Sequence, residues 1–269
     1  MKGKKPSKEL EMKIIEAHKT QAEKEVAQQF NLSVSGIRAV LKRNNIKSLK
    51  KSRINMSSIK LNVDYFKEID APDKAYWIGF ICADGNIKKT NNKVTLVSKD
   101  LEIIEKFKNI IESEHKISKR LTFDKRTNKT YTGYTIQIGN EIFTQHLINL
   151  GVTSNKTDVL NFPDIKEKYY SYFIAGLFDG DGSISHYGKN KNLLRSSLIS
   201  TKEILDFIQN YLNINFDMEI KQYYPVSKNK SNVWKLIWYK ETNTFLKFIY
   251  QDENFPYLKR KYKIYERNK

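Results

Sequence analysis

The sequence predicts an α+β protein in which a pseudo-twofold pair of αββαββα units follows a small all-α N-terminal domain. An internal repeat carries this prediction, because residues 173–184 align with residues 76–87 without a gap. The same order of helix-like and strand-like patterns follows both copies. The expected boundaries are 1–46 for a helix-turn-helix-like domain, 47–64 for a basic linker, 65–162 for the first unit and 163–269 for the second.

The N-terminal domain has the spacing of a helix-turn-helix. This motif needs a small residue where the two helices cross, a turn residue that tolerates left-handed geometry, and two inward apolar positions in the second helix. These positions are filled by Ala27, Asn31, Ile37 and Val40. The second helix would then present Arg38 and Lys42 to DNA. The alternative is a three-helix cap in which both side chains are only solvated.

Each repeated unit continues with the same series of elements after its first helix. Strand-like stretches alternate apolar and polar residues, and helix-like stretches repeat apolar residues every three or four positions. In the first unit these stretches are 93–98, 100–111, 116–123, 131–138 and 141–150, and in the second they are 192–200, 201–212, 218–226, 232–239 and 242–251. A further short strand directly after each first helix completes the αββαββα order.

The repeated helix carries its small residues in one stripe. At a spacing of four the first copy has Ala75, Gly79 and Ala83, and the second has Gly176 and Gly180. Small side chains let two helix backbones approach closely, so the copies are predicted to pack together with their C-terminal ends adjacent. The glycines that follow, Gly85 and Gly182, are expected to end the helices in the left-handed conformation.

The two helix ends predict a metal site. Asp84 and Asp181 would lie beside exposed carbonyl groups at the negative ends of two helix dipoles. Such a pocket is repulsive unless a divalent cation occupies it, and carboxylate and carbonyl oxygens suit Mg²⁺ or Mn²⁺. The expected ligands are therefore the two aspartates, together with Ala83 and Gly180 immediately before them.

The composition favours a polyanionic partner. Of the 269 residues, 39% are apolar, which is enough to fill real cores, and Lys+Arg 48 against Asp+Glu 30 gives a formal net charge of +18. No apolar run approaches about 18 residues, and the N-terminus lacks the apolar core of a signal peptide, so a membrane partner is not expected. The single cysteine, Cys82, excludes an intramolecular disulfide and indicates a cytoplasmic setting.

Residues 77–85, WIGFICADG, and 174–182, IAGLFDGDG, resemble the two signatures of the single-chain LAGLIDADG homing endonucleases. The resemblance implies that Asp84 and Asp181, at the eighth positions, bind the metal. It also implies hydrolytic double-strand cleavage of a long DNA target across the minor groove, with two antiparallel sheets forming a DNA-binding saddle on the major groove. The first motif departs at its sixth position, where Cys82 replaces the aspartate of the second copy, and one helix end is then expected to be less acidic.

The resemblance also implies two basic residues near the metals. Lys156 and Lys261 each follow the last long helical stretch of a unit, and they would polarise water and hold phosphate. The alternative for each is an ordinary solvated lysine.

DNA contacts are expected on the outward face of the strands. Alternation predicts that Tyr134, Ile136, Ile138, Trp234, Leu236 and Trp238 point inward and that Thr135, Gln137, Lys235 and Ile237 point outward. The candidates for contact with bases or phosphates are Lys88, Lys93, Arg120, Arg126, Thr135, Gln137, Arg195, Lys221, Gln222, Lys228 and Lys235.

Three functions share this scaffold. The first is a site-specific DNA endonuclease that acts as a monomer on double-stranded DNA; the second is a catalytically inactive DNA-binding regulator; the third is an intron RNA maturase. Retention of both Asp84 and Asp181 favours the enzyme over the regulator. A further alternative is that both aspartates merely cap helices. A calcium-binding loop at 179–190 is disfavoured, because its twelfth position is Asn190 instead of glutamate.

Overall fold

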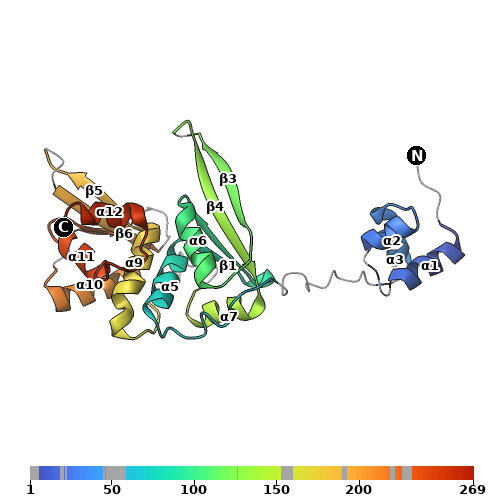
Figure 1. The fold of residues 1–269 in the computed structure, drawn as a ribbon, viewed down its shortest axis with the longest axis horizontal. Coiled ribbons are helices and arrows are strands. Elements are labelled where there is room, and N and C mark those ends of the chain that lie inside the picture. Colours follow the sequence, from blue (N-terminus) through green and yellow to red (C-terminus); the bar gives the residue numbers. More distant parts are fainter. Residues whose placement is uncertain are drawn as a thin grey trace. The chain divides into compact units, whose positions relative to one another are not determined.

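The computed structural model divides the chain into two compact units, Met1–Ser58 and Ile59–Lys269 (Figure 1). The structure describes residues 6–18, 21, 23–44, 46, 59–125, 127–152, 160–189, 193–218, 222–225 and 232–269. Within these ranges, no helix has the length and apolar character that crossing a bilayer requires.

The first unit consists of three helices around a small apolar core. They are α1 (Lys8–His18), α2 (Glu23–Gln29) and α3 (Val34–Arg43). The core side chains come from all three helices, and they include Ala27, Ile37 and Val40. Asn31 takes the left-handed conformation between α2 and α3, with a φ of 50°, and the Ser33 hydroxyl caps α3 by accepting from the Gly36 N–H. Asn31 therefore has the left-handed backbone, and Ala27, Ile37 and Val40 have the burial, that the sequence pattern predicts.

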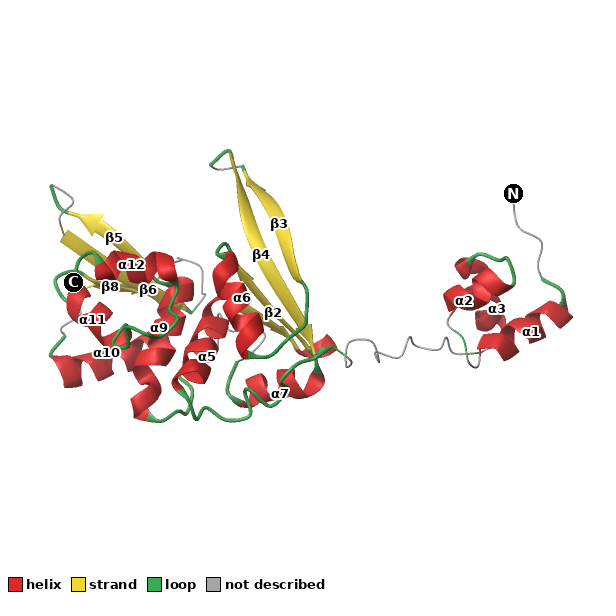
Figure 2. Cartoon of the chain, in the orientation of Figure 1, coloured by secondary structure: helices red, strands yellow, loops and turns green. Residues whose placement is uncertain are grey.

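The second unit contains the αββαββα order twice, which confirms the predicted fold (Figure 2). The first copy is α5 (Pro72–Asp84), β1 (Gly85–Lys88), β2 (Lys93–Ser98), α6 (Leu101–Ile110), β3 (Ile117–Asp124), β4 (Lys129–Gly139) and α7 (Glu141–Asn149). The second is α9 (Tyr170–Asp181), β5 (Ser183–Tyr187), β6 (Leu193–Thr201), α10 (Lys202–Phe216), β7 (Gln222–Pro225), β8 (Val233–Trp238) and α11 (Thr242–Ile249). A helix that the sequence pattern did not predict, α12 (Lys259–Glu266), follows the second copy.

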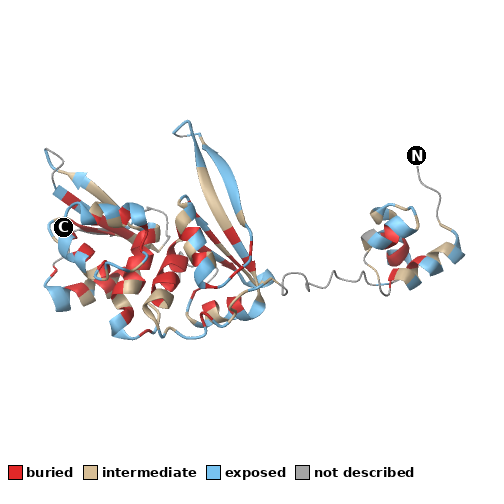
Figure 3. Ribbon diagram, in the orientation of Figure 1, coloured by how far each residue is buried: buried red, intermediate tan, exposed pale blue. Residues whose placement is uncertain are grey.

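The two copies form two four-stranded antiparallel sheets with the same strand order, β1-β2-β4-β3 and β5-β6-β8-β7. Helices α5, α6 and α7 contact the first sheet, and α9, α10 and α11 contact the second. Figure 3 shows the buried residues concentrated on the helices and the strands beneath them, while the β3–β4 hairpin extends beyond this core as an exposed ribbon.

Burial along the central strands follows most of the predicted alternation. Ile136 and Ile138 on β4 and Leu236 and Trp238 on β8 are buried, Tyr134 and Trp234 are partly buried against the core, and Gln137 is exposed. Ile237 was expected to be exposed, and this expectation is wrong: its side chain is only 6% exposed. It does lie on the outward face, but β8 is flanked there by β6 and β7, so neighbouring side chains cover it.

The linker was expected over 47–64, but the second compact unit already begins at Ile59. The Asn62 N–H donates to the Ile111 carbonyl, and the Lys60 carbonyl accepts from the Glu114 N–H. These bonds fix the segment to the end of α6, so it belongs to the second unit. Residues 47–58 lie outside the described residues.

Candidate active site

Helices α5 and α9 pack side by side through two glycines at the centre of the second unit (Figure 1). A Cβ atom on Gly79 would lie 2.0 Å from the Phe173 carbonyl oxygen, and one on Gly176 would lie 1.9 Å from the Tyr76 carbonyl oxygen. No side chain fits at such distances. The small-residue stripe therefore brings the two main chains into direct contact, as predicted.

The same packing brings the C-terminal ends of the helices together. A Cβ atom on Gly180 would lie 2.2 Å from the Ala83 Cβ and 3.6 Å from the Asp84 carboxyl carbon. A cavity of about 230 Å³ opens beside this contact, and its lining includes Cys82 and Ala83 from α5 and Asp181 from α9. Asp84 is partly buried and Asp181 is exposed, so the two aspartates occupy unequal environments.

The glycines after the aspartates differ from the expected left-handed stop. Gly85 and Gly182 have φ near −82° and ψ of 158° and 164°, which is extended backbone. Each helix passes almost directly into a strand, so no reversal is needed. Glycine is needed at both positions because no space is left for a side chain. A Cβ on Gly85 would lie 2.5 Å from the Ile81 carbonyl oxygen, and one on Gly182 would lie 2.2 Å from a ring carbon of Phe178.

Lys261 on α12 holds the C-terminal end of α9. Its ammonium donates to the carbonyl oxygens of Phe178 at 2.5 Å, Asp179 at 2.9 Å and Gly182 at 2.6 Å, and the residue is only 3% exposed. A lysine has three donors, and all three are used. Burial lowers the pKa of Lys261 to about 8, while the carboxylates of Asp179, Asp84 and Asp181 favour its charged form. It is therefore not a solvated lysine. The expectation that it polarises water and holds phosphate also does not match this arrangement, because main-chain carbonyls already use its three donors.

A buried carboxylate, Asp179, links α9 to the rest of the site. Its oxygens accept hydrogen bonds from the Tyr76 hydroxyl at 2.7 Å, the Tyr250 hydroxyl at 2.6 Å and the Leu258 N–H at 2.9 Å. Burial raises the pKa of Asp179, against the opposing effects of the Lys261 charge and these bonds. The expectation that Asp179 makes its helix end more acidic is wrong, because the side chain points into the core and is 1% exposed.

The segment from Tyr250 to Glu266 ties the second copy to the first. Lys106 on α6 donates to the Pro256 and Tyr257 carbonyls, and Arg260 on α12 pairs with Asp100 before α6. Sequence reasoning missed this support. The sequence did offer one signal, because the polar residues Tyr76 and Asp179 interrupt otherwise apolar helices. Polar side chains in such positions are buried and therefore need hydrogen-bond partners.

The candidate DNA contacts lie mostly on the sheet face opposite the core. The register places Lys88, Lys93, Arg120, Thr135 and Gln137 on this face of the first sheet and Arg195 and Lys235 on that of the second. Arg38 and Lys42 are exposed on α3, where Arg38 pairs with Glu23 at 2.7 Å. Lys156, Arg126, Lys221 and Lys228 lie outside the described residues; Gln222 lies on β7, and its side chain is not described.

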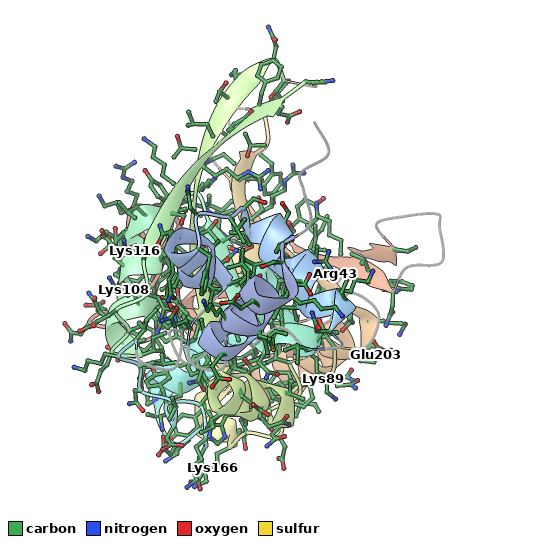
Figure 4. The ribbon with its side chains drawn as sticks, turned by 90° about the vertical axis from the view of Figure 1, so that its right-hand side faces the viewer. Arg43, Lys89, Lys108, Lys116, Lys166 and Glu203 are labelled. Atoms are coloured by element: carbon green, nitrogen blue, oxygen red, sulfur yellow. The ribbon has the colours of Figure 1, made fainter. Side chains whose placement is uncertain are left out.

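Positive charge also occurs away from the sheet faces. Figure 4 shows labelled lysines on other elements, such as Lys108 on α6 and Lys116 at the start of the β3 hairpin. Positive charge in the described part of the chain is thus not confined to the sheet faces.

Comparison with known proteins agrees with this architecture. Residues 71–155 and 168–249 match the family described as LAGLIDADG-like domain. The replication factor C small subunit of Methanocaldococcus jannaschii is 31% identical over an aligned length of 216 residues. The alignment covers 67% of this chain but only 11% of that protein's length.

Two solved structures also match this chain. The homing endonuclease I-WcaI bound to its DNA recognition sequence is 18% identical, with a TM-score of 0.54 over 83% of this chain and 97% of that chain. The N-terminal LAGLIDADG domain of DUF199/WhiA is 15% identical, with a TM-score of 0.43 over 76% of this chain and 93% of that chain. With two matched segments covering more than half of its length, the chain belongs to the LAGLIDADG-like domain family as a single chain with two motifs.

Proposed function

We propose that this protein is a site-specific DNA endonuclease that makes metal-dependent double-strand breaks in a long DNA target. The observation that carries the proposal is the meeting of the two helix ends that bear Asp84 and Asp181, beside two sheets whose open faces carry cationic side chains. Family membership supports it, and the similar I-WcaI is a DNA-bound homing endonuclease. Two acids on a pseudo-twofold axis suit a substrate with two strands.

The oxygen atoms at the helix ends fit a hard divalent cation. Among the residues that the structure describes, no three or more His, Cys, Asp and Glu side chains gather in a metal-binding group. The site therefore offers Asp84 and Asp181, with main-chain oxygens of Ala83 and Gly180 nearby. Mg²⁺ is often held by one or two carboxylates together with substrate phosphates. This donor set therefore suits Mg²⁺ or Mn²⁺ whose remaining ligands would be phosphate oxygens of the DNA. When bound, such an ion activates water and neutralises charge on the phosphate.

The chain's own residues would prepare this site in two ways. Lys261 fixes the last turn of α9 through three carbonyl groups, and its positive charge lies within the electrostatic reach of both aspartates. It would thus limit the repulsion between the two carboxylates before DNA binds. Lys156 remains proposed, on the family resemblance alone, to polarise water and hold phosphate in the first copy.

Binding would use both units of a monomer. The open sheet faces supply the described candidate contacts, and α3 of the first unit presents Lys42 and Arg38 after the left-handed turn residue Asn31. We propose that this unit adds phosphate and base contacts outside the segment bound by the sheets.

A cleavage assay separates the three candidate functions. The full chain is incubated with a randomised DNA library and Mg²⁺, and cut ends are sequenced. Cleavage at one recurrent sequence is the expected result. Specific binding without cuts would indicate a regulator. A separate assay tests the maturase, for which restored splicing of a group I intron is the diagnostic result.

A further inference from the structure

The open face of the second sheet contains a polar pocket of about 300 Å³ close to the candidate active site. Its floor is formed by the buried side chains of Ser197 and Ile237. Its walls are formed by Ser183, Ser185, Arg195, Lys235 and Tyr239. Ser183 follows Asp181 by two residues, so at most about 7 Å of chain separates the pocket from the helix end.

Strand pairing builds this pocket from three adjacent strands. Ser183 on β5 pairs with Ser197 on β6, which pairs with Ile237 on β8. Ser185 pairs with Arg195, and Lys235 precedes Ile237 by two residues, so all these side chains share one face. Their position on paired strands makes the pocket a fixed part of the sheet.

The pocket is rich in hydrogen-bond donors. Arg195 and Lys235 can only donate, and none of the described lining residues is acidic. The Arg195 Nε donates to the Ser185 Oγ at 2.9 Å, which orients the guanidinium and leaves its terminal nitrogens for another partner. A ligand that fits must therefore present acceptors, and a flat edge with two of them matches the arginine fork.

Guanine is the base that presents such an edge in the major groove. Its N7 and O6 are both acceptors, whereas adenine and cytosine present an amino donor and thymine presents a methyl group beside one acceptor. We infer that this pocket reads a guanine in the half of the DNA target that the second copy binds, next to the cleavage position. This inference rests on the proposed function.

The corresponding positions of the first sheet have different chemistry. Pairing aligns Asn86, Thr95 and Gln137 with Ser183, Ser197 and Ile237, and Lys93 with Arg195. There, Lys93 donates to the Gln137 side-chain oxygen at 3.3 Å. The amides Asn86 and Gln137 thus stand where the second sheet has Ser183 and Ile237. The two half-sites of the target should therefore differ in sequence at this position.

A binding selection tests the inference without relying on cleavage. The full chain, Arg195→Ala and the matched control Lys93→Ala are each used to select from a randomised DNA library in EDTA. We expect the wild type to select a guanine at one position of the second half-site. Arg195→Ala should reduce that preference by roughly 5- to 150-fold and leave other positions unchanged, while Lys93→Ala should retain it.

Two results would overturn the guanine assignment while DNA binding stands. One is an unchanged guanine preference in Arg195→Ala. The other is uniformly weaker binding with a salt slope reduced by about one, which is the behaviour of a phosphate contact. If the wild type selects no sequence at all, the proposed function fails together with this inference.

Discussion

Gly79 and Gly176 each lie against the main chain of the other's helix, at a place where a Cβ atom would come within 2.0 Å and 1.9 Å of a carbonyl oxygen. This reciprocal contact sets the spacing of α5 and α9. It therefore also sets where the two helix ends that bear Asp84 and Asp181 meet.

Gly79→Ala should force the two helices apart. We expect the free energy of unfolding to fall by at least about 1–3 kcal/mol, the usual cost of overpacking, and DNA cleavage to fall with it because the helix ends separate. Gly133→Ala on β4 is the matched control, since a Cβ there meets nothing within 4 Å. Urea denaturation of both variants measures the difference, and equal stability would argue against main-chain contact.

Removing the Asp179 carboxylate should destabilise the second unit strongly. Asp179→Ala leaves the Tyr76 and Tyr250 hydroxyls, the Leu258 N–H and the buried Lys261 charge without their partner. Breaking a buried charged network in this way costs about 3–5 kcal/mol. Tyr76→Phe removes only one donor and should cost about 1.5–3 kcal/mol. Thermal unfolding of the two variants checks the order, and a cost for Asp179→Ala no greater than that for Tyr76→Phe would contradict the network.

The buried lysine should make stability depend on pH. Because the pKa of Lys261 is lowered to about 8 by burial and stays near about 10.4 in the unfolded chain, the folded state binds fewer protons between these values. The free energy of unfolding then rises with pH, and this contribution is lost as pH falls through about 8. Relative to Lys261→Met, the wild type should gain up to roughly 1.4 kcal/mol per pH unit between about 8 and about 10.4, and no more above that range. Urea denaturation of both proteins from neutral to alkaline pH measures this difference. If the free energies of unfolding of the two proteins change with pH in parallel, the prediction is wrong.

Deleting residues 1–58 should weaken DNA binding and leave the cleavage chemistry in place. The cut follows the boundary between the two compact units and preserves the Lys60 and Asn62 hydrogen bonds. We expect at least about tenfold weaker binding, a shorter footprint and a smaller salt slope, because phosphate contacts are lost. Nuclease protection of a bound target measures the footprint. If its length does not change, the first unit does not bind DNA.

The sequence was sufficient to predict the repeated fold because its signals are local. A nine-residue motif occurs twice, and the strands on each side of Ile136 and Leu236 alternate clearly, so periodicity alone orders the elements. The glycine stripe also predicted the contact of the two helices, since only small residues permit it.

Other features depend on tertiary neighbours that no local pattern reveals. The environment of Asp179 is created by Tyr250 and Leu258, more than seventy residues further along the chain. The burial of Ile237 depends on strands to either side of β8. The extended conformation of Gly85 follows from the strand that begins at that residue, and a glycine after a helix otherwise favours the left-handed stop.

The most direct test of the account is cleavage by the Asp84→Asn and Asp181→Asn variants, with Asp206→Asn on α10 as the control. Each is assayed with Mg²⁺ on the target selected by the wild type, and affinity is measured on the same DNA. The account predicts that both motif variants keep their affinity within a few-fold and lose double-strand cleavage by at least about 100-fold, while the control stays active. Full double-strand cleavage by either motif variant would contradict it.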